Sequence, residues 1–360
     1  MGQHPTPHLI RVRVRPAYTV TVDAGALGAL AAGVREERLA LVTDANVGPL
    51  YGHVVQGALA NAGAQVTRFD VPAGEGSKSA QRFIELQRGF AAAGLDRSSA
   101  VVAVGGGVVG DLAGFAAATY LRGVAWYQVP TSLLAMVDAS VGGKTAIDLP
   151  EGKNLTGAFW QPRAVFADVR TLRTLPDAEF RQGAVELFKH GLLADPTLLD
   201  PFEHGFAADW PEQALAETIA RSVAVKAEIV AQDERESGAR THLNLGHTLA
   251  HALEAVSDHA LPHGDAVAYG LHYAALLARA RGLADVTPRT RRLLRWERPA
   301  PLPEASFESL RPFMARDKKN RSGRQRFVLL EDIGRPVIVD DVTPGEQLRA
   351  WGELIEEVGA

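Results

Sequence analysis

Residues 100–157 decide the fold of this chain and read AVVAVGGGVVGDLAGFAAATYLRGVAWYQVPTSLLAMVDASVGGKTAIDLPEGKNLTG. The first five residues are apolar and mostly β-branched, and three glycines follow, which predicts a buried strand entering a tight turn. Asp111 and a run of small residues over 112–120 predict a helix packed closely on a sheet. A glycine turn that leads into a helix presents free N–H groups to a phosphate, so this stretch indicates nucleotide binding.

The glycine spacing is weak evidence by itself. Gly105, Gly107 and Gly110 match the GxGxxG pattern of dinucleotide-binding proteins. The match lies too late in the chain for a first βα turn, and no acidic residue clearly ends a second strand about 20 residues later. The glycine spacing therefore does not specify which nucleotide binds, and the neighbouring segments are needed to infer it.

Composition narrows the class of protein. The chain has 360 residues, a length that suits two domains. Its formal net charge of −4 gives no support to nucleic-acid binding, and the absence of cysteine excludes disulfides and thiolate chemistry. No apolar run reaches the ~20 residues of a membrane helix, and the N-terminus lacks the apolar core of a signal peptide. We expect a cytoplasmic protein with no membrane partner.

The N-terminal part alternates predicted strands and helices. Strands are expected over 10–22, 38–43, 65–71, 99–104 and 126–129, with helices over 50–62 and 80–93. This alternation predicts an α/β nucleotide-binding domain with a mainly parallel sheet, spanning residues 1–166. Ligands of such sheets bind at the carboxyl ends of the strands, where Asp44, Glu75, Lys78 and the glycines lie.

The rest of the chain is predicted to be a mainly α-helical metal- and substrate-binding domain, residues 167–360. Helices are expected over 179–193, 211–231, 244–256, 265–281 and 288–296, and a late hairpin over 327–339 turns at Ile333-Gly334. We expect the active site in the cleft between the two domains.

The helical part concentrates histidine, glutamate and lysine in apolar settings. His247 and His251 are spaced i, i+4 on one helix face, a spacing that can bind a divalent metal. Spacing alone therefore predicts these two as ligands, with Glu254 or Glu186 as the third. A single helical histidine is more often an ordinary core or surface residue, but glycines beside His247 and His263 would allow close backbone approach.

Basic residues in apolar or glycine-rich surroundings predict a pocket for an anionic substrate. Any one of them could instead form a surface salt bridge. Lys144, Lys153 and Asn154 stand between glycines and small residues and suit a phosphate or carboxylate contact. Asp138 lies in an apolar run, and burying its carboxylate is costly unless a cation or a hydrogen-bond donor contacts it. The other basic candidates are Arg122, Lys189, Lys226, Arg240, Lys318 and Lys319.

Several motifs resemble a known family when they are taken together. They are GGGVVGDLAGFAAATYLRGV, QVPTSLLAMVDASVGGKTAID, GKNLTGAF, AVELFKHG, LNLGHTLAHALE, LPHGDAVAYG and RDKK. In this order they are similar to the 3-dehydroquinate synthase family of sugar phosphate cyclases. The resemblance implies the shikimate-pathway conversion of 3-deoxy-D-arabino-heptulosonate 7-phosphate into 3-dehydroquinate and phosphate, by transient oxidation with NAD, phosphate elimination, re-reduction and intramolecular aldol closure.

The resemblance also implies the cofactors and their ligands. It places a divalent metal, zinc or cobalt, on Glu186, His247 and His263, in place of the pair His247 and His251 that spacing alone suggests. It assigns NAD to Asp44, Asn46, Ala73, Gly74, Glu75, Gly76, Ser77, Lys78, Gly107, Val108, Val109, Gly110, Asp111, Thr131, Ser132, Lys144, Lys153, Thr171, Leu172, Arg173 and Thr174.

The substrate contacts implied by the resemblance form three groups. The phosphate side comprises Lys144, Asn154, Asn244, His251 and one of Lys318 or Lys319, and Arg122 would reach it from the partner subunit of a homodimer. The substrate carboxylate would contact Lys226 and Arg240, and the hydroxyls Asp138 and Lys189. Asp138, Lys144, Asn154, Lys189 and His251 are the expected catalytic residues.

Three alternatives remain at this point. One alternative is a related cyclase, such as 2-deoxy-scyllo-inosose synthase or amino-dehydroquinate synthase. It is disfavoured because this chain has Asn244 and His251, and because Lys226 and Arg240 are available to bind a substrate carboxylate. A metal-dependent polyol dehydrogenase would release NADH and would not need a phosphate pocket. A non-catalytic NAD-binding regulator would not need three metal ligands.

Overall fold

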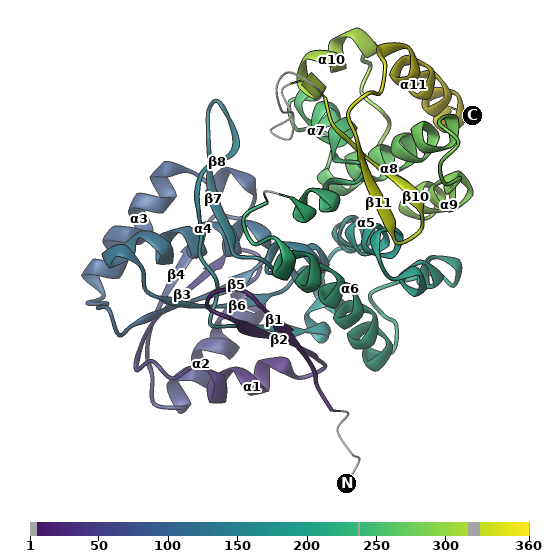
Figure 1. Ribbon diagram of the computed structural model, residues 1–360. Coiled ribbons are helices and arrows are strands. Elements are labelled where there is room, and N and C mark those ends of the chain that lie inside the picture. The colour runs from purple at the N-terminus through teal and green to yellow at the C-terminus, as the bar shows by residue number, and fades with distance from the viewer. Residues whose placement is uncertain (1–5, 237, 316–324, 360) are drawn as a thin grey trace. The chain divides into compact units, whose positions relative to one another are not determined.

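The computed structural model describes residues 6–236, 238–315 and 325–359. The chain divides into two compact units (Figure 1). Unit 1 comprises residues 1–180 and 208–234, and unit 2 comprises residues 181–207 and 235–360. Among the described residues, no helix is long and apolar enough to cross a membrane.

Unit 1 is built on a seven-stranded sheet in the order β1-β2-β9-β6-β5-β3-β4. Every neighbouring pair is parallel except β1 and β2, which are antiparallel. The predicted α/β fold with a mainly parallel sheet is therefore confirmed. The strands are β1 (His8–Val12), β2 (Tyr18–Asp23), β3 (Arg38–Asp44), β4 (Gln65–Val71), β5 (Ala100–Gly105), β6 (Ala125–Pro130) and β9 (Ala164–Asp168).

Both faces of the sheet are covered, which explains the continuous apolar runs of its central strands. In β3, Leu39 and Leu41 face the core that contains α1 and α2, whereas Ala40 and Val42 face the core that contains α3 and α4. Every residue of β5 is buried. The covering helices are α1 (Ala26–Gly33), α2 (His53–Asn61), α3 (Ala80–Ala92) and α4 (Gly107–Thr119).

Unit 1 also contains features that the sequence pattern did not predict, among them the helix α1 and the strand β9, which lies between β2 and β6 in the sheet. The segment expected as one strand over 10–22 forms the hairpin β1–β2, because residues 13–17 break the strand. Residues 144–159 form a second hairpin of β7 (Lys144–Leu149) and β8 (Gly152–Phe159), joined antiparallel. The long helix α6 (Glu212–Gln232) belongs to unit 1 as well.

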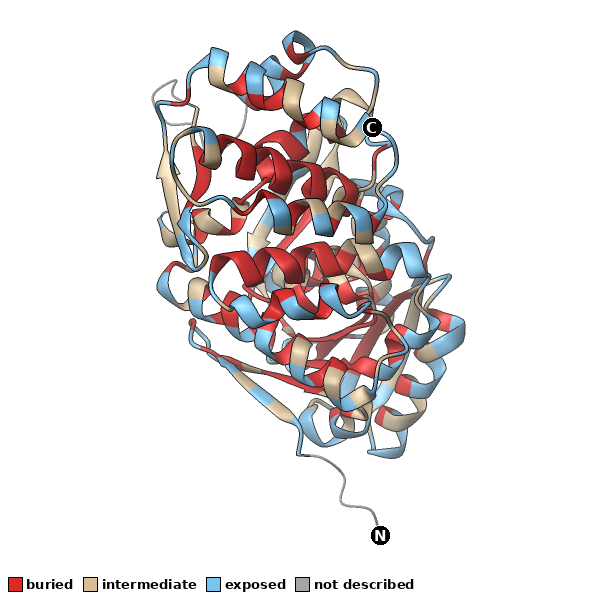
Figure 2. Ribbon diagram, turned by 90° about the vertical axis from the view of Figure 1, so that its right-hand side faces the viewer, coloured by how far each residue is buried: buried red, intermediate tan, exposed pale blue. Residues whose placement is uncertain are grey.

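Unit 2 is mainly helical, as predicted. Helix α8 lies at its centre, and nearly all of its residues are buried (Figure 2). The predicted hairpin is present and turns at Ile333-Gly334. The elements are α5 (Asp177–Leu193), whose first turn belongs to unit 1, α7 (His247–Val256), α8 (His263–Ala280), α9 (Thr287–Glu297), α10 (Phe307–Ala315), β10 (Phe327–Asp332), β11 (Arg335–Val339) and α11 (Pro344–Gly359).

Candidate active site

The carboxyl end of β5 in unit 1 carries the glycine turn, Gly105–Gly107, and α4 begins at its last residue. A Cβ atom on Gly105 would lie 2.7 Å from Cγ2 of Val109, so a larger residue does not fit without movement. Thr131, directly after β6, donates its backbone N–H to the Gly105 carbonyl at 3.0 Å. The turn and the Thr131-Ser132 pair therefore lie side by side, and the first N–H groups of α4 suit an anion there.

The end of β3 and the segment after β9 also come together in unit 1. Asp44 accepts the backbone N–H groups of Asn46 and Val47, both at 2.8 Å, which fixes the turn after β3. Tyr51 follows that turn, and its hydroxyl lies 2.7 Å from Oγ1 of Thr174. Residues 171–174 are thereby tied to the end of β3, at the edge where parallel sheets bind their ligands.

A set of polar residues surrounds Lys78, and we call it the Lys78 cluster (Glu75, Lys78, Asp111, Asp148 and Asn154). The Lys78 Nζ donates to Asp111 Oδ2 at 2.9 Å and to Asn154 Oδ1 at 2.5 Å, and it lies 3.6 Å from Glu75 Oε1. Burial raises the pKa of Asp111 to about 6, an effect that Lys78 only partly offsets. Burial alone would lower the pKa of Lys78, but Asp111 and Glu75 raise it overall. Lys78 is therefore a buried cation held by acids.

Three further predicted site residues of unit 1 are placed as follows. Lys226 on α6 donates to Asp138 Oδ1 at 2.6 Å and is 5% exposed. Lys144 opens β7 and is exposed. Arg122 and the preceding Leu121 both have positive φ, 71° and 50°, in the turn after α4.

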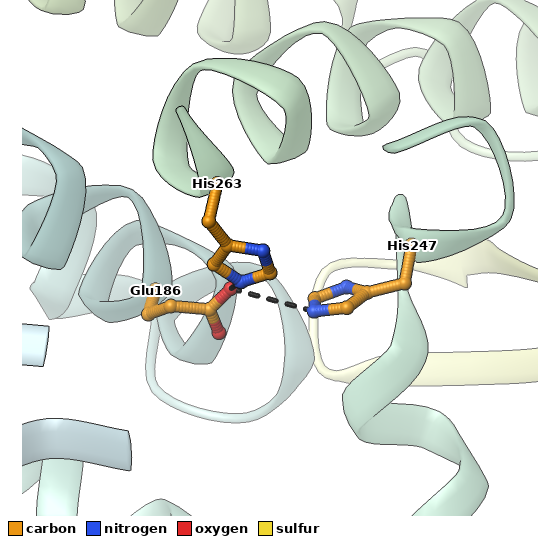
Figure 3. Close-up of side chains that lie close together, drawn as sticks. All are labelled: Glu186, His247 and His263. Atoms are coloured by element: carbon orange, nitrogen blue, oxygen red, sulfur yellow. Dashed lines mark ion pairs between the residues drawn. The ribbon is translucent and has the colours of Figure 1, made fainter. Parts of the chain in front are cut away.

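In unit 2, Glu186 on α5, His247 on α7 and His263 on α8 point toward one another, and we call them the metal set (Figure 3). Glu186 Oε1 lies 3.6 Å from His247 Nε2 and 3.8 Å from His263 Nε2. These separations are too long for hydrogen bonds. In a tetrahedral zinc site with bonds of about 2.0–2.1 Å, neighbouring ligand atoms lie about 3.4 Å apart. The geometry and the donor types fit a divalent metal ion.

Glycines allow the three helices of the metal set to approach one another. A Cβ on Gly264, next to His263, would lie 2.5 Å from Cα of Gln182 on α5. Gly246 precedes His247 with φ +81°, and its carbonyl lies 2.0 Å from where a Cβ of Gly270 on α8 would be. Side chains at these positions would push the helices apart. The glycines beside the histidines thus set the separations of the metal set.

Two other charged groups adjoin the metal set. Glu254, which spacing suggested as a possible ligand, lies with Oε1 3.3 Å from His263 Nδ1, on the opposite side of the ring from Glu186. A carboxylate in this position orients a ligating imidazole. Burial alone would lower the pKa of His263, but Glu254 and Glu186 raise it overall. Lys189, one turn after Glu186, forms a buried ion pair with it.

The remaining predicted residues of unit 2 are placed as follows. Arg240 is 1% exposed in the short helix Ala239–Asn244, and Asn244 donates to Glu236 Oε1 at 3.0 Å. His251 is exposed on α7, with its ring centre 5.4 Å from that of His247, and it is not part of the metal set. Lys318 and Lys319 lie outside the described residues.

The pattern reading of the sequence did not find the contact between Glu254 and His263. The signal available for it is that Glu254 stands seven residues after His247, two turns along the same face of α7.

Comparison with known proteins gives a consistent result along the chain. Residues 68–182 match the profile of the 3-dehydroquinate synthase N-terminal domain, and residues 183–320 match that of the C-terminal domain. A curated 3-dehydroquinate synthase from Symbiobacterium thermophilum is 48% identical over 93% of this chain and 96% of its own. A second, from Xanthomonas axonopodis pv. citri, is 47% identical over 90% of this chain and 92% of its own.

Solved structures show the same architecture in related enzymes. The 2-epi-5-epi-valiolone synthase from Streptomyces hygroscopicus, solved with NAD+ and Zn2+, is 30% identical, with a TM-score of 0.86 over 94% of this chain and 97% of its own. A 2-deoxy-scyllo-inosose synthase complexed with carbaglucose-6-phosphate, NAD+ and Co2+ is 26% identical, with a TM-score of 0.85 over 97% of this chain and 99% of its own. An iron-containing alcohol dehydrogenase from Thermococcus thioreducens, at 17% identity and a TM-score of 0.71, shares the fold.

Proposed function

Because this chain belongs to the 3-dehydroquinate synthase family, we propose that it converts 3-deoxy-D-arabino-heptulosonate 7-phosphate into 3-dehydroquinate and inorganic phosphate. The reaction is that of a phosphate-eliminating carbon–oxygen lyase of the shikimate pathway, which leads to chorismate and the aromatic amino acids. The observation that carries the proposal is similarity to curated enzymes of this name along nearly the whole chain. Its substrate and cofactor are metabolites of the cytoplasm, where we place the enzyme.

We infer that unit 1 binds NAD and that the metal set binds a divalent ion such as zinc or cobalt. Support comes from the glycine turn and the Lys78 cluster in unit 1, and from the donor separations of 3.6 and 3.8 Å in unit 2. When bound, NAD accepts and returns a hydride, and a divalent ion supplies Lewis acidity toward a substrate hydroxyl.

The residues proposed for the phosphate side supply positive charge and hydrogen-bond donors. They are Lys144, Asn154, Asn244, His251 and one of Lys318 or Lys319. Their work is to hold the phosphate in one orientation and to stabilise the charge that it gains as its bond to carbon breaks. The mostly exposed positions of Lys144, Asn154 and His251 are consistent with contact to a ligand.

Of the residues proposed for the rest of the substrate, Arg240, Lys226 and Lys189 are buried and Asp138 is partly exposed. Arg240 and Lys226, 1% and 5% exposed, are assigned to the carboxylate. A guanidinium suits this role because its planar fork can donate two parallel hydrogen bonds to a carboxylate. Asp138 and Lys189 are assigned to the hydroxyls, and each already forms an ion pair with a charged neighbour, Lys226 and Glu186. Such pairs fix the side chains before the substrate binds, which favours correct orientation.

We further propose a homodimer in which Arg122 completes the phosphate side of the partner's site. The support is backbone strain: two successive non-glycine residues, Leu121 and Arg122, hold a left-handed conformation. Such residues cost of order 1–3 kcal/mol each and often occur at functional sites. The turn leaves both side chains exposed.

Mixing two inactive variants tests this sharing. Arg122→Ala and His263→Ala, refolded or exchanged together, should regain about a quarter of wild-type activity, because half of the dimers are mixed and each mixed dimer has one complete site. A mixture as inactive as its parts would contradict the shared site.

The proposed reaction is tested by incubating the enzyme with NAD, zinc or cobalt, and the seven-carbon phosphate. We expect stoichiometric phosphate release with no net NADH. A six-carbon sugar phosphate that lacks the carboxylate is the control and should release far less phosphate. Net NADH would indicate a dehydrogenase, and faster turnover of the control would indicate a different cyclase.

A further inference from the structure

Asp148 lies near the end of β7 and is assigned no contact with NAD or substrate in the function proposed above. Its carboxylate Oδ1 accepts the backbone N–H of Asn154 at 2.7 Å. Its own backbone N–H donates to the carbonyl of Lys78 at 2.7 Å, and its Oδ1 lies 4.0 Å from the Lys78 Nζ. Asp148 therefore contacts both the loop assigned to NAD and the strand that carries a proposed phosphate contact.

Asn154 has a backbone conformation that requires support. Its φ is +55°, a left-handed conformation that asparagine adopts more readily than other non-glycine residues but that interrupts the extended backbone of β8. Such a conformation persists only where the surroundings hold it. The contact that holds the Asn154 backbone is its N–H bond to the Asp148 carboxylate.

The side chain of Asn154 is oriented from the same place. Lys78 Nζ donates to the Asn154 Oδ1 at 2.5 Å. An ammonium group has no acceptor, so the amide must turn its oxygen toward Lys78 and its NH2 group away. The outward NH2 donates hydrogen bonds, which is what a phosphate oxygen needs. Lys78, Asp148 and Asn154 thus form a closed ring of contacts that prepares this donor.

We propose that Asp148 is a positioning residue that couples the NAD loop to the phosphate contact. NAD binding at Lys78 restricts the motion of this ring of contacts and so strengthens anion binding at Asn154. By linkage, an anion bound at Asn154 strengthens NAD binding by the same factor. The proposal rests on the roles of Lys78 and Asn154 in the proposed function. It adds a residue and a cooperative effect to that function.

The experiment compares Asp148→Ala with Asp148→Asn, whose amide oxygen can still accept the Asn154 N–H. The control is Asp96→Ala, which removes a similar carboxylate bond to a backbone N–H, that of Ser98, at the opposite end of β5. Calorimetry measures the Kd of NAD with and without saturating inorganic phosphate. Hydrogen exchange of the peptide 149–157 is measured without ligands.

In the wild type and in Asp96→Ala, phosphate should lower the Kd of NAD several-fold. In Asp148→Ala this effect should vanish, the 149–157 peptide should exchange faster, and KM for the seven-carbon phosphate should rise about tenfold, with kcat within about threefold of wild type. Asp148→Asn should restore most of the effect.

The proposal is overturned if phosphate leaves the wild-type Kd of NAD unchanged, a result that needs no variant to fold. It is also overturned if Asp148→Ala retains the full phosphate effect. Phosphate release by the wild type is measured alongside: its absence would reject the proposed function, whereas normal release with an unaltered Asp148→Ala would reject only the positioning role.

Discussion

The Lys78 cluster of unit 1 and the metal set of unit 2 each gather polar side chains around a buried charged residue, Lys78 or Glu186, but the charges are arranged differently. Lys78 donates directly to Asp111 and Asn154, at 2.9 and 2.5 Å. In the metal set, the imidazole nitrogens lie 3.6 and 3.8 Å from Glu186, beyond hydrogen-bond distance. The first arrangement is held by its own contacts. The second is held by the packing of three helices, at separations that suit a cation.

The strongest test of this difference is His263→Ala. We expect activity to fall by about a thousandfold, because Lewis-acid stabilisation is worth several kcal/mol. Metal content measured by mass spectrometry should fall with it, whereas NAD binding to unit 1 should persist. His204→Ala changes an exposed histidine of unit 2 and should alter neither. Full activity of His263→Ala in metal-free buffer would remove His263 from the metal set.

The second test changes the packing and leaves the ligands intact. Gly264→Ala would place a Cβ within 2.5 Å of the Gln182 backbone and push the start of α8 from α5. We expect the metal affinity to fall by about 10- to 100-fold, which is the usual loss when residues that orient a metal ligand are changed. Gly352→Ala on α11 meets no atom within 4 Å and should leave affinity unchanged. Equal affinities in a competitive chelator titration would show that glycine packing does not set the separations.

The sequence pattern predicted most strands of the unit 1 sheet, because its central strands are covered on both faces and are therefore continuously apolar. It did not predict β9. It also did not predict β7 and β8, where glycines and polar residues hide any alternation. For the metal site, spacing favoured His251, since it shares a helix face with His247. The structure instead brings His263 to Glu186 through the contact of α5, α7 and α8. Spacing within one helix carries no information on such a contact, and the resemblance to a family supplied it.

The smallest expected effect concerns an ion pair of unit 2 that shares no residue with the metal set. Arg291 binds both carboxylate oxygens of Glu357 at 2.6 Å, and the buried His272 lies 2.7 Å from one of them. These contacts join α8, α9 and α11. We expect Glu357→Gln to reduce the free energy of unfolding by about 1 kcal/mol at pH 7 and to leave kcat unchanged.

The pH dependence of this effect has a definite sign. The hydrogen bond from Arg291 lowers the pKa of Glu357 to about 2, from an ordinary value of 4.5. A carboxyl group with a lowered pKa stabilises the folded state above its unfolded pKa, and this contribution is lost as the pH falls from about 4.5 toward 2. Urea unfolding should therefore separate wild type from Glu357→Gln at pH 7 and separate them by clearly less at pH 3, where more than half of this contribution has been lost. The exposed neighbour Glu356→Gln should match wild type at both pH values. If the free energies of unfolding of wild type and Glu357→Gln differed as much at pH 3 as at pH 7, the stabilisation would come from side-chain packing and not from charge. A loss of kcat in Glu357→Gln would show that this ion pair influences the metal set.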